Sequence, residues 1–347
     1  MKIIQFGIGP IGSAIVKLLV RKKGFQIVGA IDIDKAKVGK DLGDVAGLQR
    51  SIGVKVSDNP AKVFREAKAD LVVHSTSSFI PTVKSQLEQI TKAKLDIVST
   101  CEELSYPFRK YPKESRALDR LAKKNKTTLL GTGVNPGFLM DTLVLVSSGV
   151  CQDIDSITAR RIQDASNRRI PFQKKIGAGL TPAEFNENVA SGKFGHIGLP
   201  ESAAMVAERL GWRLKDIQQK IEPIIADNEV ASEYITVKPG QVRGLSQTAN
   251  AIDMKGREVV TFEFQASLKP PEAFDQVVIK GSPPVDLVIR GGVHGDLATA
   301  AVVVNMIPKV AAAKPGLVTM ADLPIPSAVE AVQWTQFRKG KGGMIGG

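Results

Sequence analysis

Gly7-Ile8-Gly9-Pro10-Ile11-Gly12 decides the fold, because it places a G-x-G-x-x-G pattern between an apolar run, residues 3–6, and a helical pattern. Gly7 permits a tight turn, Gly9 lets a pyrophosphate approach the backbone, and Gly12 allows helix and strand to pack closely. The helix N-terminus offers N–H groups and a positive dipole end to the phosphates. The stretch therefore predicts a dinucleotide site formed by Gly7, Gly9, Pro10, Ile11 and Gly12.

An acidic residue follows at the distance that a dinucleotide site requires. The second apolar run, residues 27–31, leads to Asp32, which lies 20 residues after Gly12. A carboxylate there binds the ribose hydroxyls and repels a 2′-phosphate, which favours NAD. Lys35 and Lys37 follow; either is able to meet the phosphate of NADP, and a solvated loop explains them equally well. We expect NAD as the cofactor with NADP tolerated, and Lys37 beside it.

Further apolar runs at residues 71–74, 95–99 and 127–130 alternate with helical patterns. Strands that are apolar throughout suit a parallel sheet covered on both faces. The sequence therefore predicts an α/β fold with a Rossmann-type doubly wound parallel sheet over residues 1–135. Small polar residues follow these runs and are expected to line the nicotinamide side of the site. They include Ser75, Thr76 and Thr100.

The pattern changes after Asn135-Pro136-Gly137, where a helix start facing the site and a simple turn are equally consistent with the residues. Residues 136–294 predict an α+β substrate domain, with a sheet that has helices on one side. The expected helices are 138–147, 182–190 and 200–210, and the expected strands are 154–162, 259–268 and 277–279. A helix over about 295–310 is expected to return to the first domain. Residues 311–347 form a C-terminal segment whose end, 338–347, we expect to be frayed.

Charge and composition exclude a disordered or fibrous chain, since 43% of the 347 residues are hydrophobic and the net charge is +12. Residues 1–150 hold 24 basic and 14 acidic groups, so most of the excess lies on the half that receives an anionic dinucleotide. With only 5% aromatic residues and no helix-turn-helix ahead of the glycines, we expect no nucleic-acid partner. A dinucleotide-sensing regulator is the non-enzymatic alternative.

Cysteine content and hydropathy indicate the expected cellular compartment of the chain. Cys101 and Cys151 cannot build a disulfide framework, and no Cys/His spacing resembles a metal site, so no metal is expected. No apolar stretch reaches the roughly 18 residues of a membrane span. We expect a cytoplasmic chain without a membrane partner.

Thr100-Cys101-Glu102-Glu103 stands at the carboxyl end of a predicted parallel strand and offers the acid–base chemistry. A partly buried carboxylate there is suited to general-base work. Equally consistent with the residues is that both glutamates stand in the first turn of a following helix, whose dipole favours acidic side chains there. Cys101 has no flanking base and is expected to pack in the core.

Candidates for substrate contact are fewer. His74 lies in a buried strand and is expected to be a core residue, whereas His196 lies in a loop before a helix, where substrate contact and a structural role are equally consistent. Arg160 and Arg161 point to opposite faces of a strand, so only one guanidinium is able to clamp a carboxylate. Surface charge is the default for the other.

Together these motifs resemble the 2,4-diaminopentanoate dehydrogenases and the related native amine dehydrogenases, with a nucleotide domain similar to that of dihydrodipicolinate reductase. The most specific matches are residues 99–104, Ser-Thr-Cys-Glu-Glu-Leu, and residues 133–138, Gly-Val-Asn-Pro-Gly-Phe. The other matching segments are residues 7–12, 30–32, 39–43, 195–202 and 292–300.

The resemblance implies NAD(P)-dependent oxidative deamination of an amine-bearing carbon, such as 2,4-diaminopentanoate to 2-amino-4-oxopentanoate, or the reverse amination of a ketone or aldehyde with ammonia. It assigns the acid–base role to Glu102 and implies a homodimer formed through the second domain. Asn135, Arg161 and His196 are then the expected substrate contacts, with Asn135 also beside the cofactor. A dihydrodipicolinate-reductase-like or homoserine-dehydrogenase-like activity is the alternative, although the former calls for a histidine-rich segment and only three isolated histidines occur.

Overall fold

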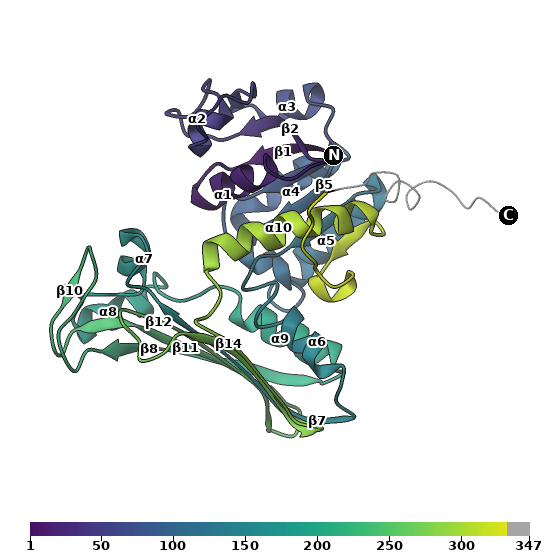
Figure 1. The fold of residues 1–347 in the computed structure, drawn as a ribbon. Coiled ribbons are helices and arrows are strands. Elements are labelled where there is room, and N and C mark those ends of the chain that lie inside the picture. The colour runs from purple at the N-terminus through teal and green to yellow at the C-terminus, as the bar shows by residue number, and fades with distance from the viewer. Residues whose placement is uncertain (332–347) are drawn as a thin grey trace. The chain divides into compact units, whose positions relative to one another are not determined.

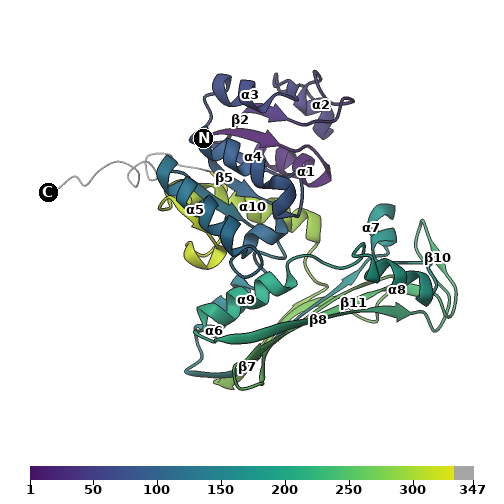
Figure 2. The ribbon, with the colours of Figure 1, turned by 180° about the vertical axis from the view of Figure 1, so that it is seen from behind.

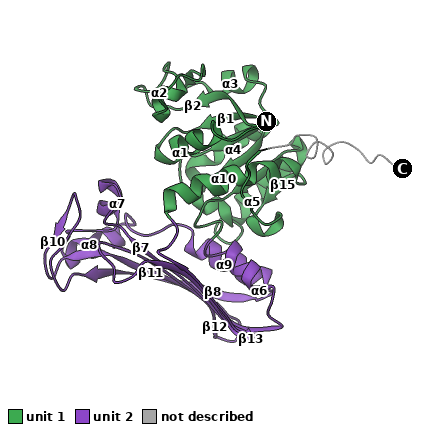
Figure 3. Cartoon of the chain, viewed as in Figure 1, with its two compact units in different colours: residues 1–138, 294–347 green, residues 139–293 purple. Residues whose placement is uncertain are grey.

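Residues 1–331 are described by a computed structural model (Figures 1 and 2), and the predicted frayed end, 338–347, lies outside them. The chain divides into two compact units (Figure 3). Unit 1 combines residues 1–138 with the chain from His294 onward, and unit 2 consists of Leu139–Val293. The helix after residue 294 thus belongs to the same unit as the glycine turn.

Unit 1 is built on a seven-stranded parallel sheet in the order β15-β6-β5-β4-β1-β2-β3. This is the doubly wound order, in which the chain leaves the β1–β4 pair in opposite directions, and the predicted Rossmann-type sheet is confirmed. The short strands β3 and β15 were not expected from the sequence. The strands are β1 (Lys2–Phe6), β2 (Gln26–Ile31), β3 (Val56–Ser57), β4 (Leu71–His74), β5 (Asp96–Ser99), β6 (Thr128–Gly131) and β15 (Gly316–Val318).

Helices cover both faces of this sheet, which is why its strands β4, β5 and β6 are buried along their whole length. Helices α1 and α10 pack together on one face, and α4 and α5 pack together on the other. Helix α10 has the length and apolar composition of a membrane span, but it packs against α1 and β5. The helices are α1 (Pro10–Leu19), α2 (Leu42–Ala46), α3 (Pro60–Glu66), α4 (Ile80–Lys92), α5 (Pro112–Asn125) and α10 (Gly295–Ala312), with short 3-10 turns η1 (Glu102–Ser105) and η2 (Met320–Asp322).

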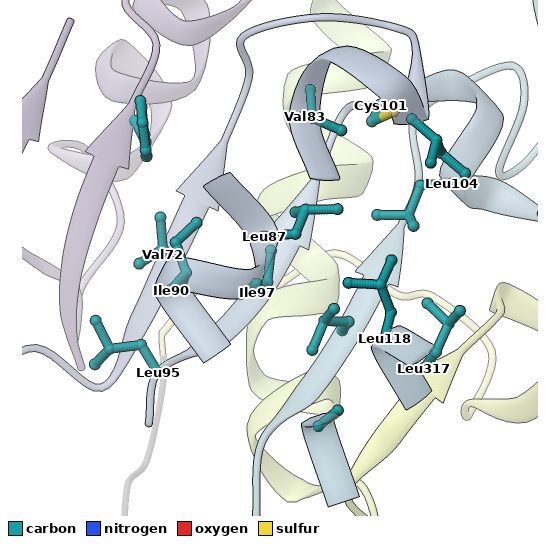
Figure 4. Packing of buried hydrophobic residues seen from close by; sticks show 14 of the residues in the cluster. Val72, Val83, Leu87, Ile90, Leu95, Ile97, Cys101, Leu104, Leu118 and Leu317 are labelled. Carbon is teal, nitrogen blue, oxygen red and sulfur yellow. The ribbon is translucent and has the colours of Figure 1, made fainter. Parts of the chain in front are cut away.

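A hydrophobic core lies between the sheet and helices α4 and α5 (Figure 4). Val83 and Leu87 of α4 and Leu118 of α5 reach this core, which also contains Cys101. Burial raises the pKa of the Cys101 thiol to about 12, so the group stays protonated and inert at neutral pH. Cys101 therefore packs in the core and anchors the segment that carries the two glutamates.

Unit 2 is built on a six-stranded mixed sheet in the order β14-β13-β7-β12-β11-β8, in which β7 and β12 are parallel and the other pairs antiparallel. Helices α6 and α9 contact each other and pack on the sheet. The predicted α+β class is confirmed. The elements are α6 (Thr142–Ser148), β7 (Asp153–Asp164), α7 (Ile170–Lys175), α8 (Pro182–Ala190), α9 (Leu199–Arg209), β8 (Leu214–Ile225), β9 (Val230–Ala231), β10 (Thr236–Val237), β11 (Val242–Asp253), β12 (Glu258–Ser267), β13 (Phe274–Ser282) and β14 (Val285–Arg290).

Two expectations for unit 2 need correction. The helix expected at 138–147 begins only at Thr142, because the Asp141 carboxylate accepts a hydrogen bond from the Thr142 N–H and caps the helix there. Helix α7 and strands β8, β9, β10, β11 and β14 were not expected. The buried side of β11 carries the polar Gln247, and its next two members, Ala249 and Ala251, are small, so the alternation of polar and large apolar side chains is weak.

Candidate active site

The glycine turn lies at the carboxyl end of β1, beside β4, where the sheet reverses its strand order. Gly7 has φ 89°, and its carbonyl accepts hydrogen bonds from Gln5 Nε2 at 2.9 Å and Ser75 Oγ at 2.8 Å. A Cβ at Gly12 would overlap the Gly7 carbonyl oxygen, whereas a Cβ at Gly9 would meet open space. Each glycine thus has the surroundings that its predicted role requires. Gly7 and Gly12 are tightly packed, and the space over Gly9 is open to a ligand.

Helix α1 begins at Pro10, and its N-cap residue, Gly9, supplies no side-chain cap. The first turn of a helix has N–H groups without intrahelical acceptors, and these are suited to an anionic ligand. The space above Gly9 and this uncapped helix start fit a pyrophosphate. The backbone of Pro10 and Ile11 belongs to the first turn of this helix, directly after Gly9.

Asp32 closes the other side of the turn. Its Oδ2 accepts a hydrogen bond from the Ile8 N–H at 2.7 Å, and its Oδ1 accepts one from the Asp34 N–H at 3.0 Å. Lys37 Nζ lies 3.2 Å from Oδ2. Burial of the carboxyl opposes ionisation, but these three donors outweigh it and hold the pKa of Asp32 below its ordinary value. A fixed, ionised carboxylate next to the glycine turn is what a ribose diol requires, so the residues fit a dinucleotide.

The two lysines after Asp32 have different partners in the structure. Lys37 approaches Asp32, and it also lies 3.4 Å from Asp34. Lys35 instead pairs with Asp58 at 2.6 Å, and 83% of its side chain is exposed. Of the two lysines, only Lys37 lies beside Asp32, and its contact with a 2′-phosphate stays a prediction.

The other predicted cofactor residues follow the neighbouring strands β4, β5 and β6. Ser75 bonds directly to the glycine turn, and Thr76 comes next. The Thr100 N–H donates to the His74 carbonyl at 2.9 Å. Asn135 is buried in the loop after β6, next to Val134, whose N–H donates to Thr299 Oγ1 at 3.3 Å. Parallel strands bring these loops to one edge of the sheet, so the structure gathers the unit-1 candidates there.

Glu102 and Glu103 both lie in η1, directly after β5, but their surroundings differ. Glu103 is 1% exposed; its Oε2 accepts from the Ile80 N–H at 2.8 Å, and its Oε1 accepts from Lys110 Nζ at 2.6 Å and Tyr111 Oη at 3.0 Å. These three donors commit Glu103 to holding the local structure. Glu102 opens the turn and is only partly buried, so the acid–base prediction remains with Glu102.

Arg161 and His196 belong to unit 2. Arg161 is 2% exposed and donates to Asp275 Oδ1 at 2.7 Å and to the Val293 carbonyl at 2.8 Å. Arg160, on the opposite side of β7, pairs with Glu263 at 2.9 Å. As the strand geometry required, the two guanidinium groups point to opposite faces, and the substrate contact of Arg161 stays a prediction.

The His196 loop is fixed to the unit-2 sheet. Gln247 Oε1 accepts from the His196 N–H at 2.6 Å, and Gln247 Nε2 donates to the His196 carbonyl at 3.0 Å. The imidazole stacks on Phe264 with 4.5 Å between ring centroids. The ring is thus positioned, while its contact with substrate stays a prediction.

The sequence did not predict the structural role of three polar residues that organise these loops: Gln5, Glu103 and Gln247. Gln5 carried a signal, since it is a buried amide inside an otherwise apolar strand. Within residues 1–331, no group of three or more His, Cys, Asp or Glu side chains is able to hold a metal ion.

Comparison with known proteins links both units to dehydrogenases. The family model of the 2,4-diaminopentanoate dehydrogenase C-terminal domain matches residues 138–339, and that of the dihydrodipicolinate reductase N-terminus matches residues 1–101. A 2,4-diaminopentanoate dehydrogenase of Acetoanaerobium sticklandii is 34% identical over 95% of each chain. An amine dehydrogenase of Streptomyces virginiae is 24% identical over 94% of this chain and 97% of its own.

A solved structure covers almost the whole chain. The amine dehydrogenase from Mycobacterium smegmatis superposes with a TM-score of 0.83 at 29% sequence identity, over 96% of this chain and 98% of its own. The likeness therefore extends over both units.

Proposed function

Because this chain belongs to the 2,4-diaminopentanoate dehydrogenase family, we propose that it is an NAD(P)-dependent oxidoreductase that acts on CH–NH2 groups. The reaction is the reversible conversion of an amine-bearing carbon and water to a carbonyl group and ammonia. The proposed substrate is 2,4-diaminopentanoate, which gives 2-amino-4-oxopentanoate; simple ketones or aldehydes with ammonia serve in reverse. The observation that carries the proposal is the placement of Glu102, next to the buried Glu103, at the sheet edge that holds the glycine turn.

When bound, NAD(P) supplies the acceptor for the hydride that leaves the amine-bearing carbon. The oxidised carbon is an iminium ion, whose positive charge the Glu102 carboxylate stabilises. Glu102 then takes a proton from water as the water oxygen bonds to that carbon, and returns the proton to nitrogen as ammonia leaves. As the C–N bond breaks and the C=O bond forms, the hydroxyl of the adduct releases its proton, so the products are a carbonyl compound, ammonia, the reduced cofactor and one proton.

The proposed cofactor contacts follow the geometry of unit 1. The backbone from Gly7 to Gly12 holds the pyrophosphate, and Asp32 binds the ribose hydroxyls, with Lys37 available to a 2′-phosphate. The proposal therefore includes use of NADP as well as NAD. The nicotinamide half is bound by Ser75, Thr76, Thr100 and Asn135.

The proposed substrate contacts are Asn135, Arg161 and His196. The planar guanidinium of Arg161 suits the carboxylate of a diamino acid, and Asp275 fixes its orientation at 2.7 Å. Simple amines lack that carboxylate. Discrimination between the two substrate classes is therefore expected to depend on Arg161.

We further propose that the chain works in the cytoplasm as a homodimer formed through unit 2, with neither nucleic acid nor a membrane as partner. The family resemblance supports the dimer. The basic half of the chain carries the dinucleotide site, so attraction of that ligand accounts for the charge.

A substrate panel tests this proposal. NAD(P)H formation is followed at alkaline pH with 2,4-diaminopentanoate and with simple amines, and NAD(P)H consumption is followed with ammonia and ketones. We expect turnover in both directions and a higher kcat/KM for 2,4-diaminopentanoate. Absence of turnover with every amine and every ketone would overturn the proposal, and DNA binding retained at 200 mM salt would favour a regulator.

A further inference from the structure

His74 ends β4 and is fully buried, yet both of its ring nitrogens are engaged. Nδ1 lies 2.9 Å from Ser99 Oγ, and Nε2 lies 2.7 Å from Gln86 Oε1 and 2.9 Å from Thr76 Oγ1. Phe6 packs against the ring edge-to-face at 5.5 Å between centroids. A buried imidazole with this many hydrogen-bond partners does more than occupy space in the core.

The partners fix the tautomer. Gln86 Oε1 only accepts hydrogen bonds, and it also accepts one from Thr76 Oγ1 at 2.7 Å, so the proton of the imidazole is on Nε2. Nδ1 is then an acceptor, and the Ser99 hydroxyl donates to it. Ser99 Oγ accepts in turn from the Cys101 N–H at 3.1 Å. A chain of hydrogen bonds therefore runs from Thr76 through the shared acceptor Gln86 Oε1 to His74, Ser99 and the Cys101 N–H.

This chain joins two loops of the proposed site. Thr76 lies in the loop after β4, and Cys101 directly precedes Glu102 in the loop after β5. Backbone hydrogen bonds reinforce the link, since the Thr100 N–H donates to the His74 carbonyl. Because β4 and β5 pair His74 with Ser99, the two residues lie side by side at the ends of their strands.

We infer that His74, held in its Nε2–H tautomer, is a positioning residue that fixes the Glu102 loop relative to the Thr76 loop. The inference rests on the proposed function, in which Glu102 does the acid–base work and Thr76 lies at the cofactor. His74 touches neither substrate nor cofactor in this role. Burial lowers the pKa of its imidazole to about 4, so the tautomer persists across the pH range in which a dehydrogenase works.

Substitutions at His74 and Ser99 test this link, because each one removes a defined part of the hydrogen-bond chain. His74→Asn retains a group at the position of Nδ1 and the contact with Ser99; His74→Leu retains neither contact. We expect His74→Leu and Ser99→Ala to lower kcat about 10- to 100-fold with little change in the dissociation constant of NAD(P), measured by fluorescence. His74→Asn keeps only the Ser99 side of the link, so its kcat should lie between those of wild type and His74→Leu. Ser148→Ala removes a buried hydroxyl of unit 2 that donates to the Leu145 carbonyl; it is the matched control and should leave kcat unchanged.

A spectroscopic readout is independent of turnover. Long-range 1H–15N correlation of the wild-type protein distinguishes the two neutral tautomers, and His74 is assigned by the signal that His74→Asn removes from the three histidines. We expect a protonated Nε2 and an unprotonated Nδ1 from pH 6 to pH 9. A protonated Nδ1, or equal kcat for folded His74→Leu and wild type, would overturn the inference. If His74→Leu fails to fold, the kcat of Ser99→Ala and the tautomer of His74 decide whether the inference holds. Absence of amine turnover by the wild-type protein would refute the proposed function and not the inferred link between the loops.

Discussion

Glu103 accepts a hydrogen bond from the backbone N–H of Ile80 at 2.8 Å, and this contact ties the turn after β5 to the first residue of α4. The Glu103 N–H also donates to the Ser78 carbonyl at 3.1 Å. Both the side chain and the backbone of Glu103 thus hold one segment, residues 78–80. The adjacent Glu102 is placed by this anchor, so two neighbouring carboxylates have different tasks.

Glu103→Leu is expected to lower the free energy of unfolding by about 2–4 kcal/mol, because it leaves the buried Ile80 N–H and the Tyr111 hydroxyl without their acceptor. Lys110→Met removes the other partner, which is 56% exposed, and should cost less than about 1 kcal/mol. Urea unfolding of both variants measures the difference. Equal losses would mean that the ion pair, and not the helix anchor, stabilises this turn.

Lys37→Met is expected to weaken NADP binding about tenfold and NAD binding less than threefold, because only NADP carries the phosphate that the ammonium group meets. Lys35→Met is the matched control, since Lys35 pairs with Asp58 away from Asp32. Titration of each cofactor by fluorescence gives the four dissociation constants. A parallel loss for NAD and NADP would show that Lys37 acts through Asp32 alone.

Arg161→Lys keeps a positive charge beside Asp275 but loses the planar fork that matches a carboxylate. We expect the KM for 2,4-diaminopentanoate to rise about tenfold, while the KM for a simple amine changes less than threefold. Arg160→Lys, on the opposite face of β7, should change neither value. Steady-state kinetics with both substrates decide; a uniform rise would indicate that Arg161 only supports the fold of unit 2.

His74 predicts acid sensitivity. Burial lowers its pKa to about 4, whereas the unfolded chain takes up the proton near pH 6.5. The unfolded state therefore binds more protons between these values, and stability falls as the pH drops from 6.5 towards 4, by about 3 kcal/mol from this group. His74→Asn lacks this contribution, so its stability relative to wild type should be constant from pH 7 to 9 and improve below pH 6.5. Urea unfolding at each pH measures this, and parallel curves down to pH 4 would contradict it.

The sequence was most informative where one residue type is required by backbone geometry. Gly7 and Gly12 have no room for a side chain, and Asp32 must follow the second strand, so local spacing revealed this part of the site. The Rossmann-type sheet followed from strands buried on both faces. Local patterns therefore predicted the class of both units.

Other features depended on contacts between residues far apart in the chain. Spacing could not separate Glu102 from Glu103, because the difference comes from Ile80, Lys110 and Tyr111 around one of them. Strand β11 escaped notice because it buries the Gln247 amide, whose partners lie in the His196 loop. Tertiary hydrogen bonds of this kind replace the apolar alternation on which strand prediction relies.

Glu102→Gln shows whether Glu102 is the acid–base group of an amine dehydrogenase. Turnover of 2,4-diaminopentanoate and the dissociation constant of NAD(P) are measured on the same preparation, with Glu88→Gln, a partly exposed carboxylate of α4, as the control. We expect Glu102→Gln to lose kcat about 10²- to 10⁴-fold with cofactor binding unchanged, and the control to keep wild-type kcat. Wild-type kcat in a folded Glu102→Gln protein would contradict this role of Glu102.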